Sequence, residues 1–440
     1  MGDQLPKEVH IAPMIDVSYR DFRMFMRLLT KRTKVWTEMI VDNTLLHNNG
    51  KRDGLDRFLG FDEQEHPVVC QLGGSNPDTL AQSVPFVEQY GYDEINLNCG
   101  CPSDRVAGKG CFGAQLMKDP EKVRDIVHAM QRQVQIPVTV KCRLGVDDLD
   151  SYEFAHQFVS TVAQGGAKHF YIHARKCLLN GLSPAQNRTI PPLMYDRVHR
   201  LCHDFPDLNF SINGGISSVE AIHAHLHGVE GCHTVPRNLV GAMVGRLAMN
   251  KPVALWDIDR AVFNVPNPES TRSRRTLAES YCEYIEGRYA DVPVENVSSH
   301  MCFKPILGLF SGIKGNKIFR QQLDTLGRSK EGRKTSAASI IRQALAAVEQ
   351  AYPTALDQPL DPACPGDFSR IREGGFEQGL CLPAPEPKAQ AEELPKVTIV
   401  NMGQDEVLDR VARMKQAVAD ARGLCDSIPW PKPEVSNGFG

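Results

Sequence analysis

The sequence predicts an α/β protein: a parallel (β/α)8 barrel of the TIM type, followed by a small all-α helical domain and a proline-rich tail. Three observations lead to this prediction. Short apolar runs alternate with amphipathic stretches from residue 8 to about 250. Polar residues stand at the ends of six of these runs, where a barrel carries its sites. Helical patterns follow, and beyond them proline becomes frequent.

The predicted strands are short and lie a few tens of residues apart. In chain order they are VHIAPM (9–14), VWTEMI (35–40), PVVCQL (67–72), EINLN (94–98), PVTVKC (137–142), HFYIH (169–173), NFSIN (209–213) and GAMVG (241–245). Helical patterns such as PDTLAQSVPFVEQY and DPEKVRDIVHAMQRQV lie between most of them. Eight alternating units favour a closed parallel barrel. An open, doubly wound sheet is the alternative, although the pattern shows no switch point for it.

Composition divides the chain into three predicted parts. We expect residues 1–255 to form the barrel, which would be the catalytic domain. Residues 271–350 read as a helical domain that ends in the alanine-rich TSAASIIRQALAAVEQA. Residues 351–440 are rich in proline and acidic side chains, which predicts a linker with one amphipathic helix at about 403–423.

The charges are unevenly distributed along the chain. A net charge of −3 argues, at face value, against a nucleic-acid partner. Residues 351–440, however, hold 9 Lys or Arg against 14 Asp or Glu, whereas residues 271–350 hold 13 against 8. The acidic tail therefore hides a basic helical segment, and such a segment is suited to binding RNA.

Thirteen cysteines are scattered without a CxxC pair, which favours free thiols in a reducing compartment over disulfides or a zinc site. The start MGDQLPKEVH lacks an apolar signal segment, and the longest apolar runs fall short of the roughly 18 residues that span a membrane. We therefore expect a protein of the cytoplasm, or of an organelle, that binds neither membrane nor metal.

Polar side chains at the ends of six predicted strands indicate a site. They are Gln71, the pair Asn96 and Asn98, the series Thr139, Lys141 and Arg143, the series His169, Tyr171, His173 and Arg175, the run Asn213-Gly214-Gly215, and Gly245-Arg246. Any one of them could be a hydrogen-bonded strand end without further function. Because the period of two puts each series on one face, their agreement across six strands favours a site at the barrel mouth.

The last two turns suggest the ligand. Glycines after the seventh and eighth runs let backbone N–H groups approach an anion, and barrels commonly bind phosphate at these loops. Arg246 would add a bidentate charge. With Lys141 and His173 deeper in the mouth, the pattern suits flavin mononucleotide (FMN), whose reduced ring is stabilised by a nearby cation.

A series of motifs resembles the tRNA-dihydrouridine synthases, specifically the DusA branch, over about residues 8–345. The motifs are APM (12–14), CQLGG (70–74), NLNCGCPSDRV (96–106), CFGAQLM (111–117), KCRLGVDDLDSYEF (141–154), HARK (173–176), GLSPAQNRTIPPL (181–193), INGGI (212–216) and MVGR (243–246). The resemblance implies an oxidoreductase in which NADPH reduces FMN, and the flavin passes hydride to a uridine in the D-loop of tRNA, at positions 20 and 20a. A cysteine then protonates C5 of the base.

The resemblance also implies the roles of single residues. The acid is Cys101, and Cys99 has no assigned role; a cysteine with a pKa of about 8.5 keeps its proton at neutral pH, whereas a carboxylate does not. The implied cofactor contacts are Ala12, Pro13, Met14, Gln71, Lys141, His173, Asn213, Gly214, Gly215, Gly245 and Arg246. The implied tRNA contacts are Asn98, Arg188, Lys317 and Arg320.

Two other functions stay open on the residues alone. One is a flavin barrel that reduces a free pyrimidine or a small enone, and the basic helical segment tells against it. The other is a catalytically silent RNA-binding module, which the intact set of mouth residues and Cys101 disfavours.

Overall fold

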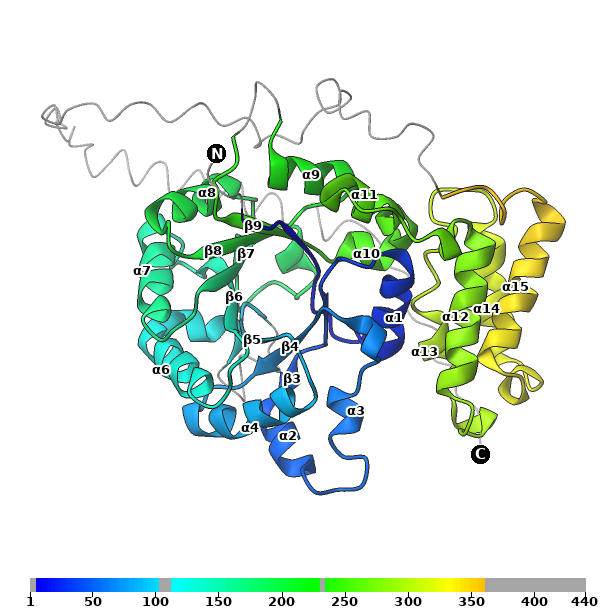
Figure 1. Ribbon diagram of the computed structural model, residues 1–440, viewed down its shortest axis with the longest axis horizontal. Helices are drawn as coiled ribbons and strands as arrows, with labels where there is room; N and C mark the ends of the chain where they lie inside the picture. The colour runs from blue at the N-terminus through cyan, green and yellow to red at the C-terminus, as the bar shows by residue number, and fades with distance from the viewer. Residues whose placement is uncertain (1–4, 103–111, 230–233, 361–440) are drawn as a thin grey trace, which may run out of the picture. The chain divides into compact units, whose positions relative to one another are not determined.

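The computed structural model describes residues 5–102, 112–229 and 234–360. Their strands form one parallel sheet in the order β1-β9-β8-β7-β6-β5-β4-β2, with β3 also paired to β4 (Figure 1). The strands are β1 Glu8–Ile11, β2 Val35–Trp36, β3 Ile40–Val41, β4 Val68–Gly73, β5 Glu94–Cys99, β6 Val138–Val146, β7 His169–Cys177, β8 Asn209–Asn213 and β9 Leu239–Val244.

The sheet curls round until its first and last strands nearly meet. His10 on β1 forms a parallel bridge with Lys34, the residue before β2. The Ile11 N–H donates to the Lys34 carbonyl at 2.9 Å, and the Lys34 N–H donates to the Val9 carbonyl at 2.8 Å. The predicted (β/α)8 barrel is therefore confirmed, and the open sheet was the wrong alternative.

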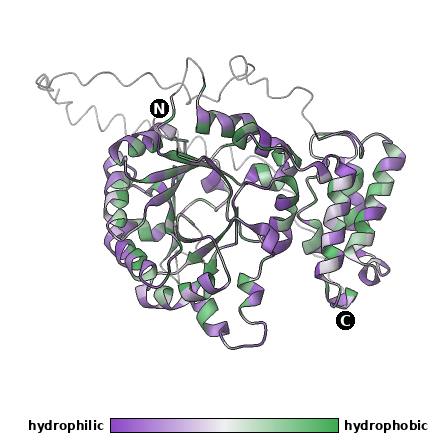
Figure 2. Cartoon of the chain, viewed as in Figure 1, coloured by the Kyte–Doolittle hydropathy of each residue, from purple (hydrophilic) through white to green (hydrophobic). Residues whose placement is uncertain are grey.

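Helices alternate with the strands and surround them. Those of the barrel are α1 Arg20–Leu29, α2 Asp42–Asn48, α3 Asp56–Leu59, α4 Pro77–Gln89, α6 Pro120–Gln131, α7 Tyr152–Ala163, α8 Tyr195–Asp204, α9 Val219–His227, α10 Arg246–Asn250 and α11 Ile258–Phe263. Short 3-10 turns lie between them at Glu63–Glu65, Gly113–Lys118, Gln186–Arg188, Pro252–Asp257 and Glu269–Thr271. The helices carry both hydrophilic and hydrophobic residues, as outer helices of a barrel do (Figure 2).

Helix α4 shows how the local sequence sets these elements. The Asn76 side chain caps its N-terminus by accepting from the Asp78 N–H at 2.8 Å, and Pro77 occupies the first turn. Leu80, Val84 and Val87 are buried; spaced by four and three residues, they form one apolar face of the helix.

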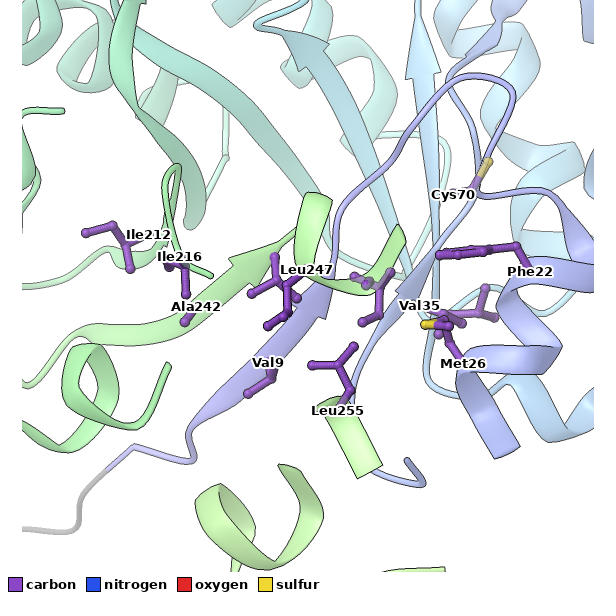
Figure 3. Close-up of a cluster of buried hydrophobic side chains, with 14 of the residues drawn as sticks. Val9, Phe22, Met26, Val35, Cys70, Ile212, Ile216, Ala242, Leu247 and Leu255 are labelled. Carbon is purple, nitrogen blue, oxygen red and sulfur yellow. The ribbon is translucent and has the colours of Figure 1, made fainter. Parts of the chain in front are cut away.

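The main core lies between the strands and the surrounding helices. Val9 on β1 and Val35 on β2 are fully buried, and Figure 3 shows them near Met26 of α1 and Leu255 of the 3-10 turn. Each such side chain contributes about 1.5–3 kcal/mol by leaving water. Apolar residues thus hold the helices to the outside of the strands, and the inside of the barrel is left for other residues.

The predicted helical segment contains α12 Arg274–Arg288, α13 Ser299–Phe303, α14 Asn316–Arg328 and α15 Ala337–Ala351, with 3-10 turns at Val294–Asn296 and Gly332–Lys334. Residues 5–360 belong to one compact unit, so the boundaries at 255, 271 and 350 remain predictions. The part of the predicted tail beyond residue 360, with its predicted helix at 403–423, is outside the described residues. No helix in the described ranges is long and apolar enough to cross a bilayer.

A buried carboxylate joins α1 to α12. Asp21 accepts hydrogen bonds from the hydroxyls of Tyr284 at 3.0 Å and Tyr289 at 2.8 Å, and its oxygen lies 2.9 Å from Nε of Arg288. Asp21 is 2% exposed. Removing one partner of a buried ion pair leaves the other charge uncompensated.

Asp21→Ala is therefore expected to lower the free energy of unfolding by about 3 kcal/mol, measured by urea denaturation. Asp324→Ala is the matched control, because Asp324 pairs with Arg328 at 2.7 Å while its side chain is 59% exposed. Its effect should stay within about 0.5 kcal/mol. Equal effects of the two substitutions would contradict the role of Asp21.

Candidate active site

The polar residues predicted at the strand ends gather at the carboxyl end of the barrel. Gln71 lies on β4, Asn98 on β5, Lys141 on β6, His173 on β7 and Asn213 at the end of β8. The strand register pairs Asn98 with Lys141, and His173 with Asn213. Because the strands are parallel, these ends meet at one mouth.

Hydrogen bonds link neighbouring members of this ring. Asn98 Nδ2 donates to Gln71 Oε1 at 2.8 Å. Lys141 Nζ donates to Asn213 Oδ1 at 3.2 Å, and Asn213 Nδ2 donates to the Met243 carbonyl at 2.9 Å. The amides thus hold the lysine and one another in fixed orientations.

The peptide groups on both sides of Cys101 are held in place. Asn98 Oδ1 accepts from the N–H groups of Gly100 and Cys101, each at 3.0 Å. Arg143 Nε donates to the Gly100 carbonyl at 3.0 Å, and the Ala114 N–H donates to the Cys101 carbonyl at 2.9 Å. The backbone that carries this thiol therefore has little freedom to move.

Cys101 differs from the other cysteines in its access to solvent. Among the cysteines in ranges 5–102, 112–229 and 234–360, it is the one that is not buried. Cys99, two residues earlier, is fully buried, and burial raises its pKa well above the usual range. Burial also raises the pKa of Cys70 to about 12. Of the two cysteines in the motif, only Cys101 is partly exposed.

Positive charge collects around the mouth. Burial, and secondarily the charge of Arg143, lowers the pKa of Lys141 to about 8. Burial, followed by the charges of Arg143 and Lys141, lowers the pKa of His173 well below its usual value, so its imidazole is neutral at pH 7. Lys141 bonds to an amide and Arg143 to backbone carbonyls, with no acidic side chain among their recorded partners in the described residues. The buried Arg143 and the half-buried Lys141, placed this way, fit an anionic ligand.

The glycines predicted to contact the cofactor stand where a side chain would lie very close to neighbouring atoms. Gly214 and Gly215 have φ values of 115° and 71°, which favour glycine. A Cβ at Gly214 would lie 2.7 Å from the His173 ring. A Cβ at Gly245 would lie 3.3 Å from Sδ of Met14 and 3.5 Å from Cβ of Ala12. The predicted segment Ala12-Pro13-Met14 therefore lies beside Gly245, as a shared cofactor site requires.

Arg246 and Arg188 lie next to each other, which the sequence did not predict. Arg246 Nη2 is 3.4 Å from the Arg188 carbonyl, and both side chains are exposed. The predicted cofactor contact, Arg246, and the predicted tRNA contact, Arg188, are therefore neighbours at the edge of the barrel mouth, which we call the rim.

The sequence reasoning named Arg143 among the mouth residues without giving it a role, and it did not single out Asn187. Arg143 Nη1 donates to the carbonyls of Lys176 and Asn187 at 3.1 Å each, besides the bond of its Nε to Gly100. The buried Asn187 side chain closes the loop after β7 by bonding to both main-chain groups of Leu178 at 2.8 Å. The alternation of Lys141 and Arg143 on one strand face was the available signal for Arg143; Asn187 gave none.

Lys317 and Arg320 do not join the mouth residues. Both are exposed on α14, which packs against α15. No group of three or more His, Cys, Asp or Glu side chains in the described ranges is arranged to hold a metal ion.

Comparison with known proteins identifies the family. The model of the dihydrouridine synthase (Dus) family matches residues 10–345. Relatives called tRNA-dihydrouridine(20/20a) synthase include one from Vibrio vulnificus, 43% identical over 342 residues, which cover 77% of this chain and 96% of the relative. One from Escherichia coli K12 is 44% identical over 315 residues, covering 71% of this chain and 84% of the relative. One from Shewanella oneidensis is 43% identical over 319 residues, covering 72% and 88%. The chain therefore belongs to the dihydrouridine synthase family.

Proposed function

We propose that this protein reduces the C5=C6 bond of uridines in the D-loop of tRNA, at positions 20 and 20a, to 5,6-dihydrouridine. One observation carries the proposal: the accessible thiol of Cys101 is fixed by its backbone at the same mouth as Lys141 and the neighbouring cations. Relatives that are named for this activity at tRNA positions 20 and 20a share 43% identity with the chain over nearly their whole length.

The reaction needs FMN, with NADPH as the reductant, and the mouth residues fit this cofactor. Lys141 would hold a positive charge against the anionic ring, and His173 would offer a neutral imidazole. The side-chain-free backbone at Gly214 and Gly245, with the guanidinium of Arg246, suits a phosphate. When bound and reduced, FMN would supply the hydride for C6 of the uracil ring.

The chain's own residues supply the rest of the chemistry. Cys101 donates its thiol proton to C5, and the thiolate that remains takes a proton from solvent. Asn98 donates one amide hydrogen to Gln71, and we infer that its second amide hydrogen contacts the substrate. The uridine must leave its stack to enter the mouth, at a cost of a few kcal/mol. Since this substrate is tRNA, we place the protein in the cytoplasm or in an organelle that holds tRNA.

The function is tested on purified protein and tRNA transcribed in vitro. The protein should be yellow, with the absorption of FMN, and should form dihydrouridine at positions 20 and 20a when NADPH is added. The control is a transcript with cytidine at those positions. A colourless protein that cannot take up FMN would overturn the proposal. Reduction of free uracil in preference to tRNA would assign the site to the reductases of small pyrimidines instead.

The exposed cations of α14 should contribute to tRNA affinity through phosphate contacts. Lys317→Ala and Arg320→Ala are each expected to reduce the slope of log affinity against log salt by about 0.7–0.9, with weaker binding, measured by filter binding or fluorescence anisotropy. These contacts carry no base specificity, so every tRNA that binds should be affected alike.

Arg132→Ala is the matched control for these two variants. Arg132 is exposed where α6 ends, at the opposite end of the barrel from the mouth. Its removal should leave the salt slope unchanged. If all three variants bind tRNA with the wild-type slope, the helical segment lies outside the tRNA footprint.

A further inference from the structure

A row of polar side chains crosses the inside of the barrel towards Cys101. We call it the polar relay; its members are Glu94, Thr139, Asn96, Gln71 and Asn98, all of them buried. Barrel interiors are usually filled by bulky apolar residues, and each buried polar group is destabilising unless it is hydrogen-bonded. Five such groups in one row therefore call for an explanation beyond packing.

Each member bonds to the next at short distance. The Thr139 hydroxyl donates to Glu94 Oε1 at 2.6 Å, and Asn96 Nδ2 donates to Thr139 Oγ1 at 3.0 Å. Gln71 Nε2 then donates to Asn96 Oδ1 at 2.9 Å. The last link is the bond from Asn98 Nδ2 to Gln71 Oε1 at 2.8 Å. The relay thus runs without a gap over strands β4, β5 and β6.

Both ends of the relay fix its direction. At the top, the N–H groups of Gly100 and Cys101 can only donate, so they require the oxygen of Asn98. At the bottom, the carboxylate of Glu94 can only accept. Every amide between them is therefore confined to one orientation, because a flipped amide would set donor against donor or acceptor against acceptor.

The lower end of the relay is firmly anchored. The Tyr171 hydroxyl donates to the Glu94 carboxylate, at 2.9 Å from Oε1 and 3.1 Å from Oε2. Lys34 Nζ lies 3.5 Å from Glu94 and 2.8 Å from Glu8. Tyr171, Lys34 and Thr139 thus all donate to Glu94, which stays an acceptor. At the other end of the relay, Asn98 holds the peptide groups beside the thiol.

We propose that the polar relay positions the Cys101 loop, and that Thr139 is a positioning residue for proton donation although it does not touch Cys101. Loss of the Thr139 hydroxyl breaks the link to Glu94 and leaves the amide of the buried Asn96 without its acceptor, so the amides up to Asn98 lose their fixed positions and Asn98 holds the N–H groups of Gly100 and Cys101 less firmly. The proposal rests on the proposed function for its catalytic meaning, but the geometry of the loop can be measured without catalysis.

The test compares three variants of the whole protein with wild type. Thr139→Val removes the hydroxyl at constant shape, and Thr139→Ser keeps it. Thr30→Val is the matched control, because the buried Thr30 hydroxyl also donates to a carboxylate at 2.6 Å, that of Asp259. Hydrogen exchange of the Gly100 and Cys101 amides, read by mass spectrometry, reports loop position; single-turnover reduction of tRNA uridine reports proton donation.

In Thr139→Val we expect about 10-fold faster exchange at these two amides and about 10-fold slower uridine reduction, since a small misplacement of a catalytic group lowers the rate steeply. Thr139→Ser and Thr30→Val should match wild type in both. If Thr139→Val does not fold, Thr139→Ala carries the same expectation.

If the amides of Gly100 and Cys101 exchange at the wild-type rate in Thr139→Val, the proposed role of the relay is wrong. It is also wrong if Thr30→Val accelerates their exchange by the same factor. If wild-type protein reduces no uridine in tRNA, the proposed function fails, whereas the exchange result still decides whether the relay positions the loop.

Discussion

Replacing Cys101 by alanine is expected to slow the reduction of uridine in tRNA by about 10²–10⁴-fold, the contribution of a positioned acid. Alanine has no proton to give to C5, and solvent replaces the fixed thiol poorly. Oxidation of NADPH by the bound flavin does not consume that proton, so its rate should change little. Stopped-flow spectroscopy separates the two half-reactions, because flavin absorption falls on reduction and recovers with tRNA.

Cys99→Ala is the control within the same motif. Cys99 is 0% exposed, and its thiol is held protonated by burial. Its loss should reduce stability by leaving a small cavity, while the uridine reaction keeps nearly the wild-type rate. A Cys101→Ala protein as fast as wild type would show that another group donates the proton.

The barrel could be predicted because its strands are buried on both faces and read as apolar runs of regular spacing. The errors occur where charged residues continue a strand. The runs at 137–142 and 169–173 extend to Val146 and Cys177 in the structure, because these two residues still pair across β6 and β7. Arg143 and Lys176 lie just beyond the predicted runs, and Arg143 remains in the strand by bonding to main-chain carbonyls.

One predicted strand, 35–40, is divided into β2 and β3. Thr37, between them, accepts from the Gln71 N–H at 3.0 Å, and its hydroxyl donates to the Glu38 carbonyl at 2.8 Å. These side-chain bonds replace part of the strand pairing. The pattern of apolar residues in a sequence does not show where side-chain hydrogen bonds replace the pairing of strands.

The mouth residues were predictable as a group, since a period of two aligns them and parallel strands end together. Their partners were not. The link from Thr139 to Glu94 depends on how β5 and β6 are staggered, and the contact of Arg143 with Asn187 depends on the path of a loop. Register and loop path come from packing of the whole barrel, so one sequence without its fold does not specify them.

Lys141→Met is expected to weaken FMN binding by about 10–100-fold, the range of one lost charge-assisted hydrogen bond. Methionine keeps most of the side-chain length and removes the charge at the mouth. Fluorescence titration of the apoprotein with FMN measures the change. Lys7→Met is the control: burial also lowers the pKa of Lys7, but its Nζ bonds to the Leu239 carbonyl at 2.8 Å, at the opposite end of the barrel. Equal affinity losses would contradict the assignment.

Lys141→Met should also stabilise the apoprotein at neutral pH. Burial, with Arg143, lowers the Lys141 pKa from 10.5 to about 8, so between these values the unfolded chain binds more protons than the folded one. The free energy of unfolding therefore rises with pH across that window, and below pH 8 the charged lysine destabilises the fold by about 3 kcal/mol. In urea denaturation the variant should exceed wild type by this amount at pH 7, with the difference shrinking towards pH 10.5. A variant less stable than wild type at pH 7 would show that Lys141 supports folding, whereas greater stability with weaker FMN binding would show that the buried charge serves the ligand.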